Sequence, residues 1–493
     1  MPSQSPALPS YSKLDGQASA THRRSPSKLA WQTRTQAAIR RPVVLVSAFA
    51  ACLVIYILVQ RPGAETALPA SSQGRTGDGW HDSLDRLTAS WRTTPRPPTE
   101  LEQKEACNPF EANGRLTVDL DDPRDTMWTP YDRECEPSNL MTTLYRPPGD
   151  TAPLIPPAAL SGSKHNRAFL PWFRNRTVVL HGDSIDRYHL KDFCSFVGGT
   201  LTNIDPHHPA SPPMWVEPKG DSKRREMEQK WRDRPKEGWE LTNPWVCDIE
   251  EYGATLVSIF TWGLAGAEKF FEMERWYHPP ARWTERMDEI TVPLLQGLAD
   301  HLDRPQITQP DLVVLNSGYW DLRKYTEEDF VAAGFPSRPY PEDSPIPYTN
   351  LSPEREKQWE RDAREAIRHA ARTFRGKEGK ARNGPALLWR TLHHPPRHNY
   401  APFPRVFALD SLARHIVSDL RSSSPSSLGG NNEEADEDLG LAHRLRLDES
   451  GRIMLGQEHH FRDLLHPKAV PGSWIWADVM LYELKRAVDG VDR

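Results

Sequence analysis

The sequence predicts an α/β fold, a three-layer α/β/α domain in which helices cover both faces of a mainly parallel, five-stranded sheet. Two observations lead to this prediction. Short apolar runs alternate along the chain with longer segments in which apolar residues recur at helical spacing. Strands that alternate with helices pair in parallel, and a parallel sheet is covered by helices on both faces.

The predicted strands are five short apolar runs, at 178–180, 200–204, 254–260, 312–315 and 386–389. The predicted helices are five longer segments, at 185–197, 284–302, 354–375, 404–420 and 473–488. The last of them shows one apolar stripe, the pattern of a helix that buries one face, formed by Trp474, Ala477, Leu481, Leu484 and Val488.

Composition divides the chain of 493 residues into four parts. Residues 1–41 are rich in Ser, Pro, Gln and basic groups, which predicts a disordered cytosolic tail. Residues 42–60 are expected to form a transmembrane signal anchor, and residues 61–104, polar and dotted with proline, a lumenal stem. Residues 105–490 are expected to form the folded domain, with a disordered low-complexity insertion at 421–440.

The predicted anchor has an uncharged core at 43–59. A helix of this length spans roughly 26 Å, enough to cross a thin bilayer. Arg34, Arg40 and Arg41 precede it and Arg61 stands alone after it, so the positive-inside rule predicts a single-pass type II protein with a lumenal domain. The short span suits the ER or Golgi membrane. A cleaved signal peptide is the alternative.

Four of the five cysteines follow the predicted span: Cys107, Cys135, Cys194 and Cys247. An even number of cysteines in a lumenal domain predicts two disulfides, with three possible connectivities. Of these we favour Cys107–Cys135 with Cys194–Cys247. Four buried free thiols are the alternative.

Two sequons for N-glycosylation fit the same location. Asn175-Arg176-Thr177 is the stronger one, so Asn175 is expected to carry a glycan. In Asn350-Leu351-Ser352, the following Pro353 weakens the signal.

The charge and the aromatic content of the chain indicate which classes of partner it could bind. The net charge of −5 lacks the basic excess of nucleic-acid-binding proteins, so no nucleic-acid partner is expected. Seventeen tryptophans are a high number. The flat apolar face of Trp stacks on sugar rings, although core packing accounts for tryptophans equally well.

A serine follows the first predicted strand, in the stretch from His181 through Gly182-Asp183-Ser184 to Arg187. A serine at a strand-to-helix turn lies at the carboxyl edge of the sheet, and the N–H groups that begin the helix favour developing negative charge. This is the setting of a nucleophile, with the Ser184 N–H as one oxyanion donor. Three residues this common also occur by chance, and a helix N-cap is the alternative.

Asp463 and His466 lie three residues apart near the end of the chain. Residues at this spacing in one helical turn lie side by side, so Asp463 can hold the imidazole while its other nitrogen takes a proton from Ser184. A surface turn before the last helix is the alternative. The three residues together predict a catalytic triad. It is not built on a nucleophile elbow, because the second glycine of G-x-S-x-G is missing.

These motifs resemble the GDSL/SGNH hydrolase superfamily and, within it, the PC-esterase or trichome-birefringence-like family, in a fungal-type, membrane-anchored form. The match covers about residues 105–490, with gaps. Further blocks agree in order and spacing: Cys107-Asn108-Pro109-Phe110 with Gly114, Trp128, Tyr131 and Cys135; Arg187; Asp311 to Leu315 followed by Asn316-Ser317-Gly318-Tyr319-Trp320; Leu388 to His394; and Val470-Pro471-Gly472-Ser473-Trp474. Pro467 replaces the tryptophan that usually follows the family's histidine, and the final cysteines of plant members are missing.

The resemblance implies an SGNH-like fold and assigns an oxyanion role to Asn316. A glycine after the strand at 254–260 is expected to supply a further N–H. Gly263 and Gly266 both qualify, and we take Gly263. A strand-end asparagine taken alone is more often a turn former.

Arg187, Trp320 and Arg390 are candidate substrate-positioning residues. For the two arginines we favour a structural role, in which each pins the nucleophile turn through a buried ion pair. The motifs of metal-dependent chemistry are weak: Asp119-Leu120-Asp121 has the DxD shape of some glycosyltransferases, and histidines pair at 207–208, 393–394 and 459–460 without further ligand spacing. No metal is therefore expected.

The expected function is acyl transfer, most specifically O-acetylation of a glycan or polysaccharide in the secretory pathway. No bound cofactor is expected, and the acyl donor, acetyl-CoA or an acetylated carrier, is a substrate. The same triad with water as acceptor would make the protein an esterase. A non-catalytic glycan-binding or scaffold protein is the third alternative.

Overall fold

The computed structural model describes residues 107–150, 169–213, 222–233, 241–264, 280–335, 350–376, 384–396, 398–422 and 440–490. The predicted tail, anchor and stem, most of the insertion at 421–440, and Gly266 lie outside these residues. None of the described helices has the length and apolar character that crossing a membrane requires.

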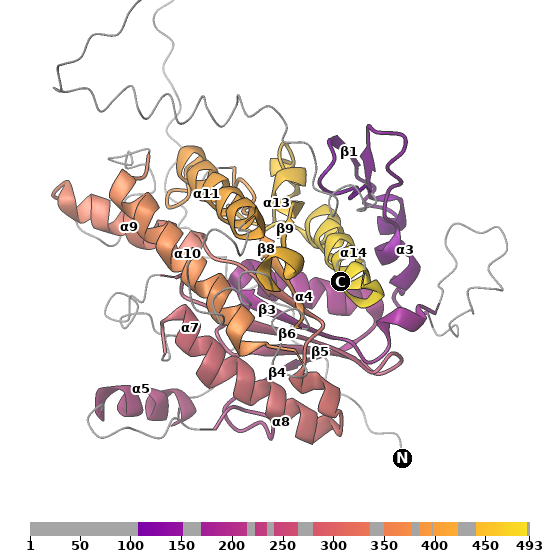
Figure 1. The fold of residues 1–493 in the computed structure, drawn as a ribbon, viewed down its shortest axis with the longest axis horizontal. Helices are drawn as coiled ribbons and strands as arrows, with labels where there is room; N and C mark the ends of the chain where they lie inside the picture. Colours follow the sequence, from indigo (N-terminus) through magenta and orange to yellow (C-terminus); the bar gives the residue numbers. More distant parts are fainter. Residues whose placement is uncertain are drawn as a thin grey trace, which may run out of the picture. The chain divides into compact units, whose positions relative to one another are not determined.

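The centre of the domain is a seven-stranded sheet in the order β4-β5-β6-β3-β7-β8-β9 (Figure 1). Its strands are β3 (Thr177–Gly182), β4 (Thr200–Asn203), β5 (Trp245–Ile249), β6 (Ala254–Phe260), β7 (Leu312–Leu315), β8 (Ala386–Arg390) and β9 (Leu445–Asp448). The five strands β6-β3-β7-β8-β9 are parallel, whereas β4 and β5 pair antiparallel at one edge. A separate hairpin consists of β1 (Gly114–Thr117) and β2 (Met127–Pro130).

The predicted α/β class and mainly parallel sheet are confirmed, but the predicted number of five strands is wrong. The run at 200–204 forms the antiparallel edge strand β4, and two strands, β5 and β9, were not predicted. In β9, Arg446 and Asp448 alternate with leucines, and both charged side chains are buried. Buried charges hide the apolar pattern by which a core strand is recognised.

All five predicted helical segments contain helix. The helices of the described residues are α3 (Leu140–Leu144), α4 (Ser184–Val197), α5 (Ser222–Asp233), α7 (Trp283–Arg286), α8 (Val292–Leu302), α9 (Tyr319–Ala332), α10 (Pro353–Thr373), α11 (Phe403–Ser422), α13 (Ser450–Ile453) and α14 (Trp474–Asp489). Short 3-10 or π turns are η2 (Pro123–Asp125), η4 (Pro171–Phe173), η6 (Met287–Thr291), η7 (Pro305–Thr308), η11 (Glu458–His460) and η12 (Ala469–Ser473).

Helix α9 was not predicted because much of its buried face is polar. Glu327 is buried and pairs with Arg323 at 2.9 Å, and the carboxylate of Asp329 accepts hydrogen bonds from Arg405 and Arg355. Charged residues at these positions resemble a solvated face in the sequence, although here they are paired inside the protein.

Alternate side chains along the parallel strands divide the core into two layers. Val179 of β3 packs in the cluster that includes residues of α8, α10 and α11, whereas Val178 and Leu180 pack in the cluster that includes α4 and α14. Figure 1 shows these helices on the two sides of the sheet. The sheet is thus covered on both faces, as the alternation of strands and helices predicts.

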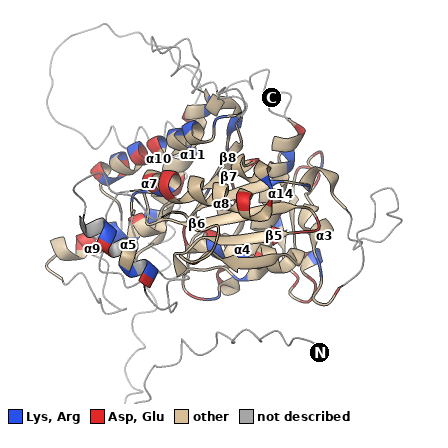
Figure 2. Cartoon of the chain, turned by 90° about the horizontal axis from the view of Figure 1, so that it is seen from below, with Lys and Arg blue, Asp and Glu red and all other residues tan. Residues whose placement is uncertain are grey.

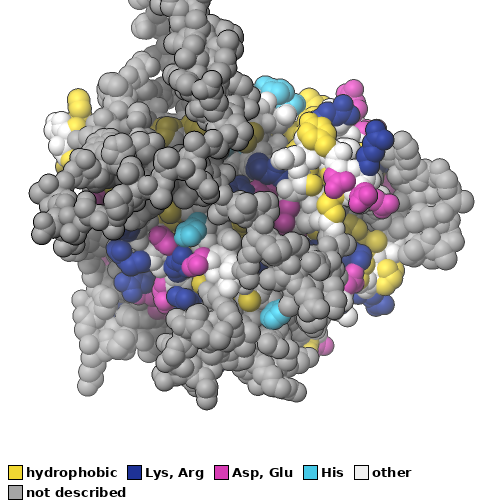
Figure 3. Space-filling model, turned by 45° about the horizontal axis from the view of Figure 1, so that its top comes forward, with side chains coloured by type: hydrophobic (Ala, Val, Ile, Leu, Met, Phe, Trp, Pro, Cys, Tyr) yellow, Lys and Arg dark blue, Asp and Glu magenta, His cyan; other side chains and the backbone are white. Residues whose placement is uncertain are grey.

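Charged side chains of both signs are interspersed on the surface. Along α10, basic and acidic residues alternate on the side away from the sheet (Figure 2). The visible part of the face in Figure 3 likewise mixes acidic and basic side chains. This mixture accords with the nearly balanced composition of the chain.

Two pairs of cysteines lie at disulfide distance. Cys107 and Cys135 have Cα atoms 5.4 Å apart, and Cys194 and Cys247 have Cα atoms 5.6 Å apart. This is the pairing that we favoured among the three connectivities. The second disulfide joins α4, the helix that begins at Ser184, to β5 at the sheet edge.

Candidate active site

Ser184 is the first residue of α4 and follows the end of β3 directly. In the sheet, β3 lies between β6 and β7, both of which come later in the chain. After β3 the chain passes through α4 to β4 on one side of β3, and it later crosses from β6 to β7 on the other side. Such a switch point at the carboxyl ends of parallel strands is where α/β proteins bind ligands. As the first residue of the helix, Ser184 also has a backbone N–H without an acceptor inside the helix.

A reciprocal capping box fixes the turn that holds Ser184. The carboxylate of Asp183 accepts the Ile185 N–H at 2.8 Å, and the carboxylate of Asp186 accepts the Asp183 N–H at 3.0 Å. Gly182 is required for this arrangement, because a Cβ at that position would lie only 1.9 Å from Asp186 Oδ2. Two of the three residues of the Gly-Asp-Ser motif thus position the third.

The three residues of the predicted triad meet. Ser184 Oγ lies 2.8 Å from His466 Nε2, and His466 Nδ1 lies 2.8 Å from Asp463 Oδ2. The sequence separation between Ser184 and His466 is 282 residues. These distances are those of a hydroxyl, an imidazole and a carboxylate in one hydrogen-bonded chain.

Asp463 holds His466 by a turn that is not helical, contrary to the helical turn that we expected. The segment consists of bends, and Asp463 Oδ1 accepts the backbone N–H groups of Leu465 at 2.8 Å and of His466 at 2.7 Å. Such an aspartate-centred turn brings the side chains of Asp463 and His466 together just as a helical turn would. The same carboxylate therefore shapes the loop and binds the ring.

The charge on Asp463 is stabilised. Partial burial alone would raise its pKa, but the hydrogen bond from the His466 ring, the electrostatic attraction of that ring and the two backbone N–H groups hold the pKa well below its usual range. Asp463 is therefore an anion at any physiological pH. It remains half exposed, with 50 % side-chain accessibility, whereas His466 has 17 %.

A clamp fixes the His466 loop to the helix that begins with Ser184. The Arg462 guanidinium donates to Asp192 of α4 at 2.6 Å and to the Pro467 carbonyl at 2.7 Å, and lies 4.4 Å from the centre of the Tyr188 ring. The Tyr188 ring in turn meets the His466 ring edge to face, with centroids 4.8 Å apart. The clamp thus fixes the His466 ring relative to the helix that carries Ser184.

The sequence reasoning missed this clamp, although a signal for it exists. Tyr188 and Asp192 follow Ser184 at intervals of four residues, which places all three on one face of α4. His393 was also missed as a neighbour of the triad. Its Nε2 lies 2.7 Å from the carbonyl oxygen of Leu465, and burial lowers its pKa to about 3, so the neutral ring donates to the loop that carries His466.

Arg390 lies beneath the turn that carries Ser184. Its guanidinium donates two hydrogen bonds to Asp186, at 2.8 and 2.9 Å, and its side chain is 1 % exposed. Arg390 also lies 3.7 Å from Asp183. The buried pair matches the structural role that we favoured, and any effect of Arg390 on a substrate would act through the turn.

The two other candidate oxyanion residues flank the end of β3. Asn316 follows β7, donates its backbone N–H to the His181 carbonyl at 3.1 Å and its side-chain amide to the Arg390 carbonyl at 2.8 Å. On the other side, the segment after β6 is joined to β3 by the Thr261 N–H, which donates to the Gly182 carbonyl at 2.6 Å.

Gly263 adopts a left-handed backbone with φ of 92°, and a Cβ there would lie 2.6 Å from Asp321 Oδ1. Asp321 accepts the Leu264 N–H at 2.9 Å and is buried. It therefore shapes the turn that carries the Gly263 N–H. Asp321 was not singled out in the sequence, although it stands five residues after Asn316.

The remaining positioning candidates are Arg187 of α4 and Trp320 of α9. Arg187 is half-buried, donates to the Leu241 carbonyl, and lies 5.3 Å from the Tyr188 ring centre. Trp320 packs edge to face on Trp262 at 4.9 Å between ring centres, and the Arg323 guanidinium lies 5.0 Å from its ring. These contacts do not fix a role toward a substrate for either residue, so both roles stay predictions.

The residues considered as possible metal ligands make contacts within the protein instead. Asp119 Oδ1 accepts the N–H groups of Asp121 and Asp122 at 2.8 and 2.9 Å, which makes the DxD segment a turn. His394 stacks on Phe403. Within the described part of the chain, no group of three or more His, Cys, Asp or Glu side chains is arranged to hold a metal ion.

Neither a protein-family model nor a curated protein matches this chain in sequence comparisons. The resemblance to the PC-esterase or trichome-birefringence-like family therefore rests on the motifs themselves and stays a prediction.

Proposed function

We propose that the protein is an acyl-transfer enzyme in which Ser184 is the nucleophile, His466 the general base and Asp463 the residue that orients His466. One observation carries this proposal. The Ser184 hydroxyl, the His466 ring and the Asp463 carboxylate form one hydrogen-bonded chain at the carboxyl edge of a parallel sheet. The ionised Asp463 favours the tautomer with its proton on Nδ1, which leaves Nε2 free to accept the hydroxyl proton.

In the first half of the reaction, Ser184 Oγ bonds to the acyl carbonyl carbon as its proton passes to His466 Nε2. The bond to the leaving group then breaks, and the leaving group takes that proton. In the second half, an acceptor hydroxyl gives its proton to His466 and attacks the acyl-serine, and the proton returns to Ser184 Oγ as the serine leaves. The chemistry is balanced without a cofactor.

The negative charge on the carbonyl oxygen needs donors. The Ser184 N–H at the start of α4 is one, and the Gly263 N–H and the Asn316 amide are the others in this proposal. Support for the set comes from the sheet order, because the ends of β6 and β7 lie on either side of the end of β3. Removal of one such donor typically costs about 10²–10³ in rate.

We propose a glycan or polysaccharide hydroxyl as the acceptor and O-acetylation in the ER or Golgi lumen as the reaction. Support comes from the family resemblance, from the predicted type II anchor, and from two cysteine pairs at disulfide distance, which fit an oxidising compartment. A transferase must exclude water from the acyl-serine or hold the acceptor hydroxyl in line.

Hydrolysis is the second candidate, and one observation favours it. Asp463 is half exposed in the described part of the chain, so solvent reaches the outer side of the triad. With water as acceptor, the same steps release a free acid, and the protein is an esterase.

One incubation separates the two candidates. The purified lumenal domain is given an acyl donor, such as acetyl-CoA or an acetylated aryl ester, with and without a glycan, and Ser184→Ala is the control. A transferase forms an O-acetylated glycan, and the acyl-serine decays faster when the right glycan is added. Free acid at a rate indifferent to every glycan, together with deacetylation of acetylated glycans, would establish the esterase.

A further inference from the structure

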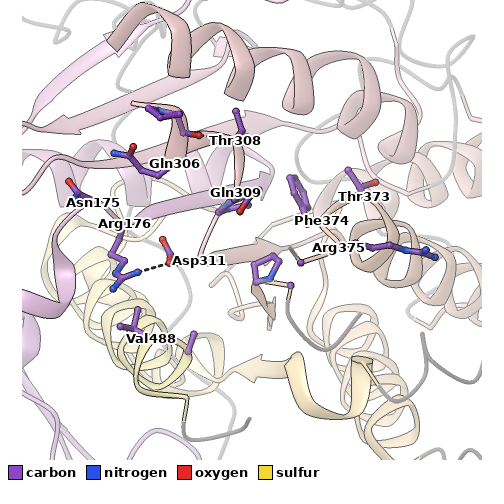
Figure 4. Close-up of a pocket in the computed structure, with 16 residues that line it drawn as sticks. Asn175, Arg176, Gln306, Thr308, Gln309, Asp311, Thr373, Phe374, Arg375 and Val488 are labelled. Atoms are coloured by element: carbon purple, nitrogen blue, oxygen red, sulfur yellow. Dashed lines mark hydrogen bonds and ion pairs between the residues drawn. The ribbon is translucent and has the colours of Figure 1, made fainter. Parts of the chain in front are cut away.

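A cavity of about 740 Å³ opens at the amino edge of the sheet, the edge opposite the triad. It lies where β3, β7 and β8 begin and where α10 and α14 end, and Figure 4 shows residues from all these segments around it. Because β3 has six residues, the cavity and Ser184 are separated by about 20 Å. A ligand of the triad cannot account for this cavity.

The lining of the cavity suits a ligand that is rich in hydroxyl and amide groups. Gln306, Gln309 and Thr308 present polar side chains, and Val488 adds an apolar surface (Figure 4). Gln309 is exposed and Gln306 is half-buried, so both side-chain amides are accessible to a ligand in the cavity. Amides donate and accept at once, which is what sugar hydroxyls and acetamido groups require.

The charge of the described lining residues is nearly neutral, which argues against a strongly ionic ligand. Arg176 is paired with Asp311 at 2.9 Å, as the dashed line in Figure 4 shows. Arg375 is the other charged side chain among the described residues of the lining. Neutral sugars fit such a lining better than a phosphate or a nucleotide does, since those need several cationic partners.

Asn175 of the predicted sequon lies on the rim of this cavity. It is exposed, has a left-handed backbone with φ of 55°, and its N–H donates to the Tyr252 carbonyl at 2.9 Å. Thr177, the third residue of the sequon, is 1 % exposed within β3. Its hydroxyl is accessible only before β3 joins the sheet, so any glycosylation of Asn175 must precede folding.

We propose that the first sugars of an N-linked glycan on Asn175 occupy this cavity. Asn175 Nδ2 bonds to the anomeric carbon of the first N-acetylated sugar and loses one proton, while the lipid-diphosphate carrier leaves. The covalent link keeps the sugar at an effective concentration in the millimolar range, so a few hydrogen bonds from Gln306 and Gln309 are sufficient to hold it. Glycosylation of Asn175 requires that the domain lies in the lumen, but it does not depend on the proposed catalysis.

The test uses the full-length chain expressed in cells with a secretory pathway. Mass spectrometry of glycopeptides measures the occupancy of Asn175, and a peptide-N-glycosidase is then applied to the folded and to the denatured protein. We expect occupancy and slow release from the folded protein. The double variant Gln306→Ala/Gln309→Ala should speed release from the folded protein about tenfold, the factor expected for one or two lost hydrogen bonds.

Gln296→Ala is the matched control, because Gln296 is an exposed glutamine of α8 outside the cavity, and its release rate should equal that of the wild type. An unmodified Asn175, or equal release from the double variant and the wild type, overturns the proposal.

A second variant keeps the test decisive if the double variant does not fold. Thr177→Val removes the sequon but leaves Asn175 in place. Hydrogen exchange of residues 305–310 and 373–376 should then be faster than in the glycosylated protein, because the sugars no longer cover them. Unchanged exchange in both segments overturns the proposal, whatever the outcome of the activity assays.

Discussion

Arg390 and Asp186 form a bidentate ion pair beneath the turn that carries Ser184, with each oxygen of the carboxylate accepting one guanidinium hydrogen bond. The two residues are 204 positions apart in the chain and each has a side chain that is 1 % exposed. Asp186 also caps the helix that begins at Ser184. The pair thus joins β8 to the turn that presents the hydroxyl.

Arg390→Ala should destabilise the protein by about 3–5 kcal/mol, because it leaves the buried Asp186 carboxylate without its partner. Urea unfolding of the purified domain measures this loss. Arg364→Ala is the control, since Arg364 pairs with the exposed Asp419 and such pairs contribute about 1 kcal/mol or less. Equal losses in the two variants would contradict the structural role of Arg390.

Arg462→Ala should lower kcat/KM by roughly 10–100-fold with little change in stability, because small displacements of a catalytic group are costly. The variant removes the ion pair to Asp192 and the hydrogen bond to the Pro467 carbonyl. Steady-state kinetics and thermal unfolding, measured side by side, separate the two effects. Arg304→Ala, which breaks a comparable pair with Asp248 at the sheet edge, should leave kcat/KM unchanged.

Asp183 should make stability depend on pH. Burial raises its pKa to about 6, against the attraction of Arg390 and with added repulsion from Asp186. Between about pH 4 and pH 6 the folded protein keeps this proton and the unfolded chain loses it, so the contribution of Asp183 to stability falls as the pH rises through that window.

Asp183→Asn stays neutral and keeps an oxygen that can accept the Ile185 N–H. The difference in the free energy of unfolding between the variant and the wild type should therefore shift in favour of the variant by on the order of 3 kcal/mol between pH 4 and pH 7. Unfolding free energies at both pH values provide the test. A difference between variant and wild type that does not change with pH would show that Asp183 titrates normally.

The cysteine pair between α4 and β5 should matter for stability. Cys194→Ser breaks a link across 53 residues of chain, and loss of such a disulfide typically costs about 2–5 kcal/mol. Denaturant unfolding under oxidising conditions measures the loss. The wild type in reducing agent lacks both disulfides, whereas the variant in oxidising buffer lacks only Cys194–Cys247. If these two samples differed widely in stability, the Cys107–Cys135 pair would also contribute to stability.

Much of the fold could be predicted, because the apolar pattern of a buried strand is contained in a few consecutive residues. The runs at 254–260 and 312–315 are buried on both faces and coincide with β6 and β7. Strand β9 and helix α9 could not be predicted, because the pairing of Arg446 with Glu483 and of Asp329 with Arg405 lies outside any local window. Long-range pairing decides whether a charged residue is buried or exposed.

The site shows the same division. Ser184, Asp463 and His466 could be named from short motifs, because each motif combines the chemistry with its own turn. The residues that position them could not, since Arg462, His393 and Asp321 act through contacts to residues that lie far away in the sequence. Only Tyr188 and Asp192 left a sequence signal, in their spacing on α4.

Reaction of the protein with a fluorophosphonate, which bonds to an activated serine oxygen and releases fluoride, tests the triad most directly. Peptide mass spectrometry then locates the label. We predict a single label on Ser184, none in Ser184→Ala, and a rate lower by about 10⁴ or more in His466→Ala, as expected for loss of a triad base. A label on another residue, or equal labelling of Ser184 in His466→Ala, would contradict the triad and the acyl-transfer function built on it.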